Sequence, residues 1–136
     1  MSAIHEAIYN ALVNDSVLTA LVPVENIRRG LQDPVEMPSL RFYSSETRFV
    51  GDDISKNQML HQTIVVTILG INDLELEEIS PALVNAMNVD NLSHDDLVFH
   101  SCMPERDMRG TFFDPIRKVN RKDISFIVAY SPSNSD

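Results

Sequence analysis

The chain has only one cysteine, Cys102, among its 136 residues. A single thiol excludes an intrachain disulfide framework and any zinc site built from four cysteines. The four glycines are dispersed, so no phosphate-cradling loop is formed. No apolar run approaches the roughly 20 residues that a membrane-spanning helix needs, and no basic segment precedes an apolar core at the N-terminus. We therefore expect a soluble protein of the cytoplasm, or of a particle assembled there, without a membrane partner.

Basic residues are also scarce, with 11 Lys and Arg against 20 Asp and Glu and a formal net charge of −9. This balance argues against binding nucleic acid through its phosphates, which requires clustered cations. The charges are nevertheless segregated: the segment 73–96 holds acids and no Lys or Arg, whereas six bases occur between 106 and 122. Two interpretations stand, either two solvated faces or head-to-tail complementarity between copies of the chain.

The segment 59–71, MLHQTIVVTILGI, is the feature around which the rest of the chain is organised. Its centre is β-branched and apolar at successive positions, which is typical of a central strand that is covered on both faces. At about 3.3 Å per residue it would span roughly 43 Å, enough to cross a domain of this length. We expect one face to pack on helices and part of the other to meet a neighbouring subunit.

Three amphipathic segments predict helices on one face of that sheet. Ser2 and Asp15 are placed to cap the first two. The third has two possible starts: either Ser80 caps it with Pro81 at the first helical position, or it begins near Leu74 and contains Pro81. The expected buried positions are Ile4, Ala7, Ile8, Ala11 and Leu12 in the first helix, Val17, Leu18, Leu21 and Val22 in the second, and Ile79, Ala82, Leu83, Ala86 and Met87 in the third.

The remaining segments predict strands, so the fold class is α+β, a mainly antiparallel sheet of four to six strands with two or three helices packed on one face. We expect a single domain over 1–131, a flexible tail at 132–136, and a mobile connection around residues 50 to 57. The expected strands are a short one at 26–28, one at 39–43 continuing to 49, 59–71, 97–103, 108–113 and 124–130.

No pattern in the sequence predicts catalysis, a cofactor or a metal centre. His100 and Cys102 are two residues apart in an expected strand and would share a face, but a zinc site needs two further ligands. Cys102, with apolar neighbours, is better interpreted as a small buried hydrophobe. The expectation is a protein that is not an enzyme.

Aromatic and basic residues near the C-terminal end are the candidates for an interface. Phe112 and Phe113 are adjacent, so in an extended segment only one ring can enter the core and the other could anchor in a partner's pocket. The candidate subunit or partner interface consists of Arg48, Arg106, Arg109, Phe112, Phe113, Arg117, Lys118, Arg121 and Lys122.

The order of features is similar to that of the tail terminator (tail-completion) proteins of long-tailed bacteriophages. The features are the N-terminal helices, the segments NIRRG at 26–30 and MPSL at 37–40, the strand at 61–71, the helix ending in LVNAM at 83–87, and the closing strand at 123–130. The resemblance covers nearly the whole chain, and the positions of Gly and Pro are its most specific part.

This resemblance implies a non-enzymatic virion structural protein of the tail–neck region, assembled in the host cytoplasm. It would form a hexameric ring that caps the tail tube, ends tube polymerisation and joins the tail to the head. Its partners would be the tail tube protein and a neck or connector protein, and DNA would pass through its channel without specific binding. The alternatives are a head-completion or head–tail joining protein, or a small cytoplasmic ligand-binding or regulatory domain.

Overall fold

A computed structural model describes residues 2–30, 36–50, 59–105, 112–115 and 118–133. The helical elements are α1 (Ala3–Val13), α2 (Ser16–Leu21), η1 (Val24–Asn26), α3 (Asp73–Ala86) and η2 (Val89–Asn91). The strands are β1 (Ile27–Arg29), β2 (Ser39–Val50), β3 (Met59–Gly70), β4 (Leu97–Pro104), β5 (Phe112–Asp114) and β6 (Val119–Pro132).

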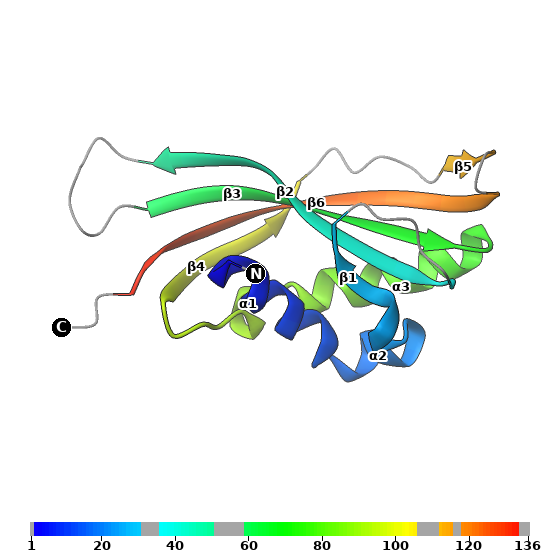
Figure 1. Cartoon of the computed structure of the whole chain (residues 1–136), viewed down its shortest axis with the longest axis horizontal. Helices are drawn as coiled ribbons and strands as arrows, with labels where there is room; N and C mark the ends of the chain where they lie inside the picture. Colours follow the sequence, from blue (N-terminus) through cyan, green and yellow to red (C-terminus); the bar gives the residue numbers. More distant parts are fainter. Residues whose placement is uncertain (1, 31–35, 51–58, 106–111, 116–117, 134–136) are drawn as a thin grey trace.

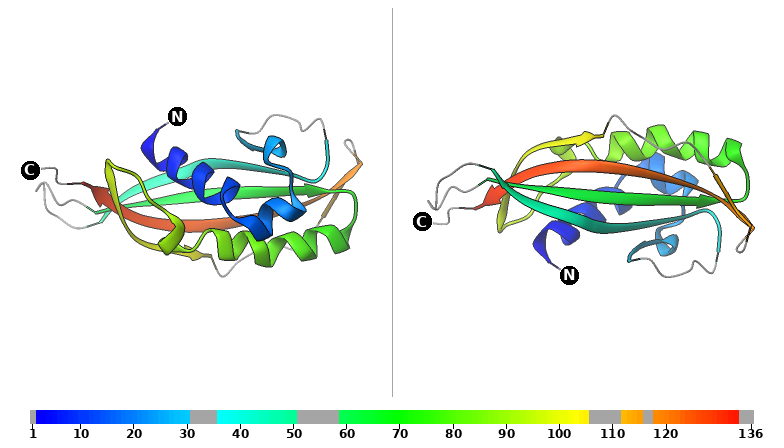
Figure 2. Two further views of the ribbon diagram at one scale, coloured as in Figure 1. Left: turned by 90° about the horizontal axis from the view of Figure 1, so that it is seen from below. Right: turned by 90° about the horizontal axis from the view of Figure 1, so that it is seen from above.

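The six strands form one sheet in the order β1-β2-β3-β6-β4, and β5 also pairs with β6. Every pairing is antiparallel except that of β1 with β2, which is parallel. The described α-helices all lie on one side of the sheet, which leaves the other side without a helical layer (Figures 1 and 2). We call these two sides the covered face and the open face. The predicted fold class is confirmed.

The central position of the long apolar strand is also confirmed. β3 runs from Met59 to Gly70, pairs with β2 on one side and with β6 on the other, and so lies in the middle of the sheet. Ile71, the last residue of the expected strand, lies just beyond it and is 67% exposed. The Ile71 amide instead donates to Glu75 Oε1 (3.0 Å) in the first turn of α3.

Two other strands are longer than the expectation. β2 extends to Val50, and the expected connection at 50–57 lies outside the described residues from 51 on. β6 begins at Val119 rather than 124 because its polar first residues pair with β3 through the backbone, which apolar periodicity does not detect. At the other end Pro132, expected in the tail, is opposite Leu97 of β4.

Capping residues explain where the first two helices begin. Ser2 is the N-cap of α1, but its side chain contacts the His5 ring instead of a backbone amide. Asp15 caps α2 as predicted, accepting a hydrogen bond from the Leu18 amide (2.9 Å). Val17 is 64% exposed, contrary to the expected apolar face, because the six-residue α2 turns Leu18 toward the core and has no room for a wider stripe.

The start of α3 follows the second of its two predicted alternatives. Asn72 is the N-cap and accepts from the Glu75 amide (2.9 Å), so the helix contains Pro81. Ser80 is therefore not a cap, and its hydroxyl donates to the Leu76 carbonyl (2.7 Å). The proline is tolerated because the carbonyl it leaves without a helical donor belongs to Glu77, an exposed residue that water can reach.

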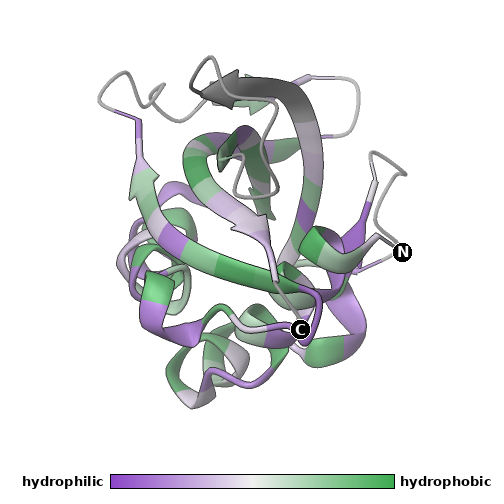
Figure 3. Cartoon of the chain, turned by 90° about the vertical axis from the view of Figure 1, so that its left-hand side faces the viewer, coloured by the Kyte–Doolittle hydropathy of each residue, from purple (hydrophilic) through white to green (hydrophobic). Residues whose placement is uncertain are grey.

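The core lies between the helices and the covered face of the sheet. Alternating green and purple stretches along the helices in Figure 3 show the amphipathic pattern that directs apolar side chains toward the sheet. All predicted buried positions of α1 and α3 are buried. The largest fully buried side chains are Phe42, Phe126, Ile8, Leu12, Leu18, Ile27, Leu40, Ile64, Ile68, Leu76, Ile79 and Leu83.

Candidate assembly surface

The two halves of the sheet differ in how their edges are covered. In the half next to α3, β1 pairs with β2 only at positions 40–42, and β5 pairs with β6 only at positions 119–121. These two short strands lie on opposite edges, so this half has a flanking strand on each side. We call it the flanked half.

In the other half, neither edge has a flanking strand among the described residues. In the described part of the chain, the outer edge of β2 has no pairing from Tyr43 to Val50, and β4 is the last strand on the opposite side. The register places the two edges at the same level, because Tyr43 is opposite Val65 of β3, which is opposite Ser125 of β6, and the Glu105 amide reaches the Ser125 carbonyl (2.8 Å). We call this the open-edged half.

The open face of this half carries exposed apolar side chains. Met103 is directly opposite Ile127, and their exposed fractions are 63% and 39%. Val98 is opposite Ser131 on the same face and is 46% exposed. We call Val98, Met103 and Ile127 the edge patch. Clustered exposed apolar residues on an unpaired edge strand mark a surface for another molecule.

A β-bulge at His100 determines which β4 side chains join the core. The register with β6 shifts between Phe99 and Ser101, which leaves His100 unpaired, exposed and hydrogen-bonded to the Ser131 hydroxyl (2.9 Å). Cys102 returns to the covered face and packs against the core. The expectation that His100 and Cys102 share a face is therefore wrong, since the bulge adds one residue between them.

The position of Cys102 bears on its reactivity and on whether it could bind a metal ion. Cys102 packs against the core but is half-buried, so the predicted small buried hydrophobe is found only in part. Its partial burial raises the pKa of the thiol to about 12. Among the residues that the structure describes, no three His, Cys, Asp or Glu side chains gather in a way that could hold a metal ion.

The open face of the flanked half carries a polar cluster. The Thr67 hydroxyl donates to Asp123 Oδ1 (2.8 Å), and Arg121 pairs with both Asp123 carboxylate oxygens (3.1 and 3.2 Å). Their side chains are partly buried, at 27% exposed for Arg121 and 17% for Asp123. Arg121, a predicted interface residue, thus has an intramolecular role here.

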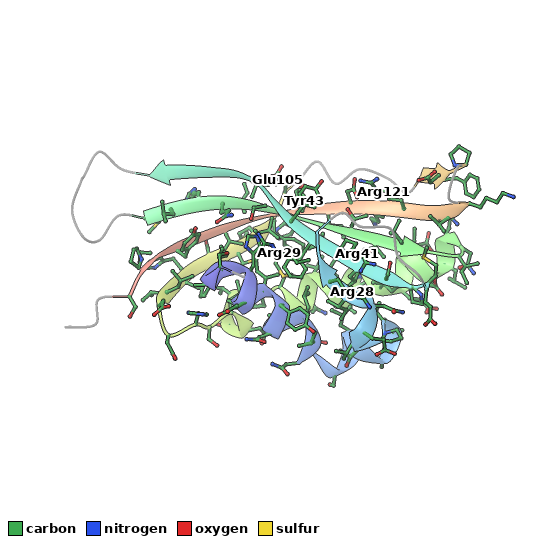
Figure 4. The ribbon with its side chains drawn as sticks, in the orientation of Figure 1. Arg28, Arg29, Arg41, Tyr43, Glu105 and Arg121 are labelled. Carbon is green, nitrogen blue, oxygen red and sulfur yellow. The ribbon has the colours of Figure 1, made fainter. Side chains whose placement is uncertain are left out.

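Arg41 is a buried cation that the sequence analysis missed. It is 4% exposed, and burial first, then the charge of Arg28, lowers its pKa. Arg28 is opposite it across β1 and β2, and Figure 4 shows both side chains beside these strands. The sequence pattern that could have located Arg41 is the alternation of Leu40, Arg41 and Phe42, because it assigns Arg41 to the face opposite the core.

The other predicted interface residues divide into three groups. Phe113 is 55% exposed on β5, Lys118 is exposed in the turn before β6, and Lys122 is half-buried opposite Ile68. Arg48 and Phe112 occupy strand positions, but their side chains lie outside what the structure describes. The residues entirely outside the described part are Arg106, Arg109 and Arg117. The described structure thus brings Phe113, Lys118 and Arg121 into one β5–β6 hairpin.

Comparisons with known proteins identify the fold. No protein-family model and no curated protein matches the sequence. A solved structure does match: a chain of the virion of a native gene transfer agent particle, at a TM-score of 0.78 and 15% identity, with 95% of each chain covered. The two chains therefore share one fold over nearly their whole length. In the described part of the chain, no helix is long and apolar enough to cross a membrane.

Proposed function

We propose that this chain is a non-enzymatic virion structural protein of the tail terminator type. It would form a hexameric ring that caps the tail tube, ends tube polymerisation and joins the tail to the head or neck. The observation that carries this proposal is the match over 95% of both chains to a protein of a phage-like virion particle. The order of helices, strands, Gly and Pro that resembles tail terminators supports the more specific role.

The open-edged half of the sheet supports assembly into a ring. Successive strands β2, β3, β6 and β4 alternate in direction, so β4 of one copy placed on β2 of the next would continue the antiparallel sheet. The two edges are on opposite sides of the chain, which makes the contact head-to-tail, and repeated head-to-tail contacts form a ring where the rotation between copies closes. The edge patch would be buried beside this junction.

The charge of the chain supports a channel through which DNA passes without specific binding. With a net charge of −9, a ring of several copies repels phosphate and lowers retention of the DNA. The two ends of the ring would contact the tail tube protein and the neck or connector protein. The exposed aromatic Phe113 is opposite Asn120 at the Gly70 end of β3, the end of the sheet away from Met59, where an axial partner could bind it.

The ring proposal is tested by the mass of the protein in solution with matched variants. Ile127→Asp and Met103→Asp place a charge in the edge patch, and both should lower the native mass from a ring to a monomer. Val17→Asp is the control, since Val17 is 64% exposed on α2, away from this edge. A wild-type protein that stays monomeric at high concentration, or a control that dissociates as the patch variants do, would contradict the proposal.

The finer role is tested in particles that carry the patch variants. Loss of a tail terminator produces overlong tails or unjoined heads and tails in negative-stain images, whereas filled heads without a neck indicate a head–tail joining protein. A tight dimer whose melting temperature rises with a metabolite would instead support the ligand-binding alternative.

A further inference from the structure

A chain of hydrogen bonds crosses the interior from the start of α1 to β6. The Tyr130 hydroxyl donates to Gln62 Oε1 (2.8 Å), and Gln62 Nε2 donates to the Ser44 hydroxyl (2.6 Å). Ser44 Oγ contacts His5 Nε2 (2.6 Å), and His5 Nδ1 contacts Ser2 Oγ (2.5 Å). The chain thereby links α1 to three neighbouring strands, β2, β3 and β6, in the open-edged half.

The donors and acceptors in this chain determine the position of the imidazole proton. Ser44 accepts from Gln62, and no other acceptor for the Ser44 proton is present among the described contacts, so we assign that proton to His5 Nε2 as the acceptor nitrogen. The imidazole proton is therefore on Nδ1 and is donated to Ser2. A second proton on Nε2 would oppose the Ser44 hydroxyl proton and force that hydroxyl to turn away.

The surroundings of His5 also disfavour a charged ring. His5 is 6% exposed and stacks on Phe42 with ring centroids 6.2 Å apart. The charged groups that act on it are Arg29 of β1 and the amino terminus, both positive. Glu6, its neighbour in α1, instead contacts His94 Nε2 (2.8 Å). Burial first, then these positive charges, lowers the pKa of His5.

We propose that the chain from Ser2 to Tyr130 is an acid-released latch, which holds the first turn of α1 on the sheet while His5 is neutral. Protonation of His5 reverses the hydrogen bond at Ser44 and adds a buried positive charge that Arg29 and the amino terminus repel. The first turn then leaves the sheet, because in water the imidazolium is solvated and far from these charges. The latch belongs to the single chain and does not depend on ring assembly.

The direction of the pH effect follows from the lowered pKa. The released state binds the proton at the ordinary His value near 6.5, whereas the latched state binds it only at lower pH. The latch is therefore at full strength above that value and weakens as the pH falls. At a pH between the two pKa values, release of the latch takes up one proton. The equilibrium constant for release therefore rises about tenfold for each unit by which the pH falls.

Amide hydrogen exchange measured from pH 7.5 to 4.5 tests the latch, after correction for the pH dependence of the intrinsic exchange rate. The probe is the Glu6 amide, which donates to the Ser2 carbonyl (3.0 Å) and closes the first turn of α1. In the wild type, opening of the first turn of α1 should increase as the pH falls below about 6.5, by about tenfold per pH unit until the pKa of His5 in the latched state is reached. His5→Gln should remove this dependence. The control His94→Gln should keep it, because it alters the contact with Glu6 and the hydrogen bond from the Asp96 amide but no member of the chain from Ser2 to Tyr130. The same slope in wild type and His5→Gln, or a flat wild type, would overturn the proposal.

A second measurement keeps the proposal testable if His5→Gln fails to fold. Long-range proton–nitrogen NMR of the wild type should show the His5 proton on Nδ1 at pH 7.5. As the pH falls, the His5 imidazolium signal should appear only together with loss of protection in the first turn of α1. An imidazolium that forms near pH 6.5 while the first turn stays protected would overturn the latch.

Discussion

The covered and open faces of the sheet differ although they are built from alternate residues of the same strands. On β6, Phe126 is fully buried on the covered face, and its neighbour Ile127 is 39% exposed on the open face. On β3, Ile64 and Val66 are fully buried on the covered face, and Val65 between them is 8% exposed. The covered face is thus completed by the chain's own helices, whereas the open face is completed only in part.

The two halves of the open face differ in whether contacts within the chain satisfy their side chains. In the flanked half, Thr67, Asp123 and Arg121 satisfy one another through hydrogen bonds and an ion pair. In the open-edged half, Met103 and Ile127 contribute apolar surface instead. Apolar surface contributes to stability only when it is removed from water, so in the proposed ring this half would be stabilised by a neighbouring copy.

The largest expected effect is the difference in labelling rate between thiols placed on the two faces. Cys102 is half-buried on the covered face with a pKa raised to about 12, so its thiolate fraction at pH 8 is about a thousandfold below that of an ordinary thiol. In the double variant Cys102→Ser, Ser101→Cys the thiol moves one residue, to the open face opposite Ala129. Labelling with a disulfide reagent should then accelerate by two to three orders of magnitude. Equal rates would show that β4 does not separate the two faces.

The second prediction compares core and surface truncation in one strand. Phe126→Ala should lower the free energy of unfolding by about 3–5 kcal/mol, because it leaves a cavity in the fully buried layer. Ile127→Ala, one residue further, should cost less than about 1 kcal/mol in the monomer. Urea unfolding of both variants, at a concentration where the chain is monomeric, gives the two values. A comparable loss in Ile127→Ala would mean that the open face is packed within a single chain.

The third prediction concerns the polar cluster in the flanked half. Asp123→Ala removes the acceptor of Thr67, which is 3% exposed, and the ion-pair partner of Arg121. The free energy of unfolding should fall by about 1–2 kcal/mol, because a buried hydroxyl loses its acceptor. Asp123→Asn retains an acceptor for Thr67 and should lose less. Equal losses in the two variants, measured by urea unfolding, would assign the whole effect to the charge.

The covered face was predictable because apolar periodicity reports it directly. The stripe at Ile79, Leu83 and Met87, and the alternation of Leu40 and Phe42, both correspond to buried positions. The same periodicity placed the central strand at 59–71, one residue longer than β3. Local apolar patterns are sufficient here because the helices that cover this face belong to the same chain.

The open-edged half could not be derived in the same way, since it depends on pairings between distant segments. The edge patch combines Met103 and Ile127, which are 24 positions apart in sequence and meet only through the β4–β6 register. The bulge at His100 exchanged the faces of the residues after it, and no local residue type signals that exchange. The latch likewise joins His5 to Ser44 across 39 positions.

The smallest expected effect tests whether the flanked half can be stabilised without affecting the open-edged half. Lys118, in the turn between β5 and β6, has a φ of 57°, a left-handed conformation that is strained for any residue with a Cβ atom. Lys118→Gly should raise the free energy of unfolding by about 0.5–1 kcal/mol over Lys118→Ala, because the alanine control loses the same charge but keeps the Cβ. Thermal unfolding of the two variants gives this difference, and the native mass of both should equal that of the wild type. A glycine variant that is no more stable than the alanine variant would show that the turn is not strained. A change in the native mass of both variants would instead assign the Lys118 charge to the interface between copies.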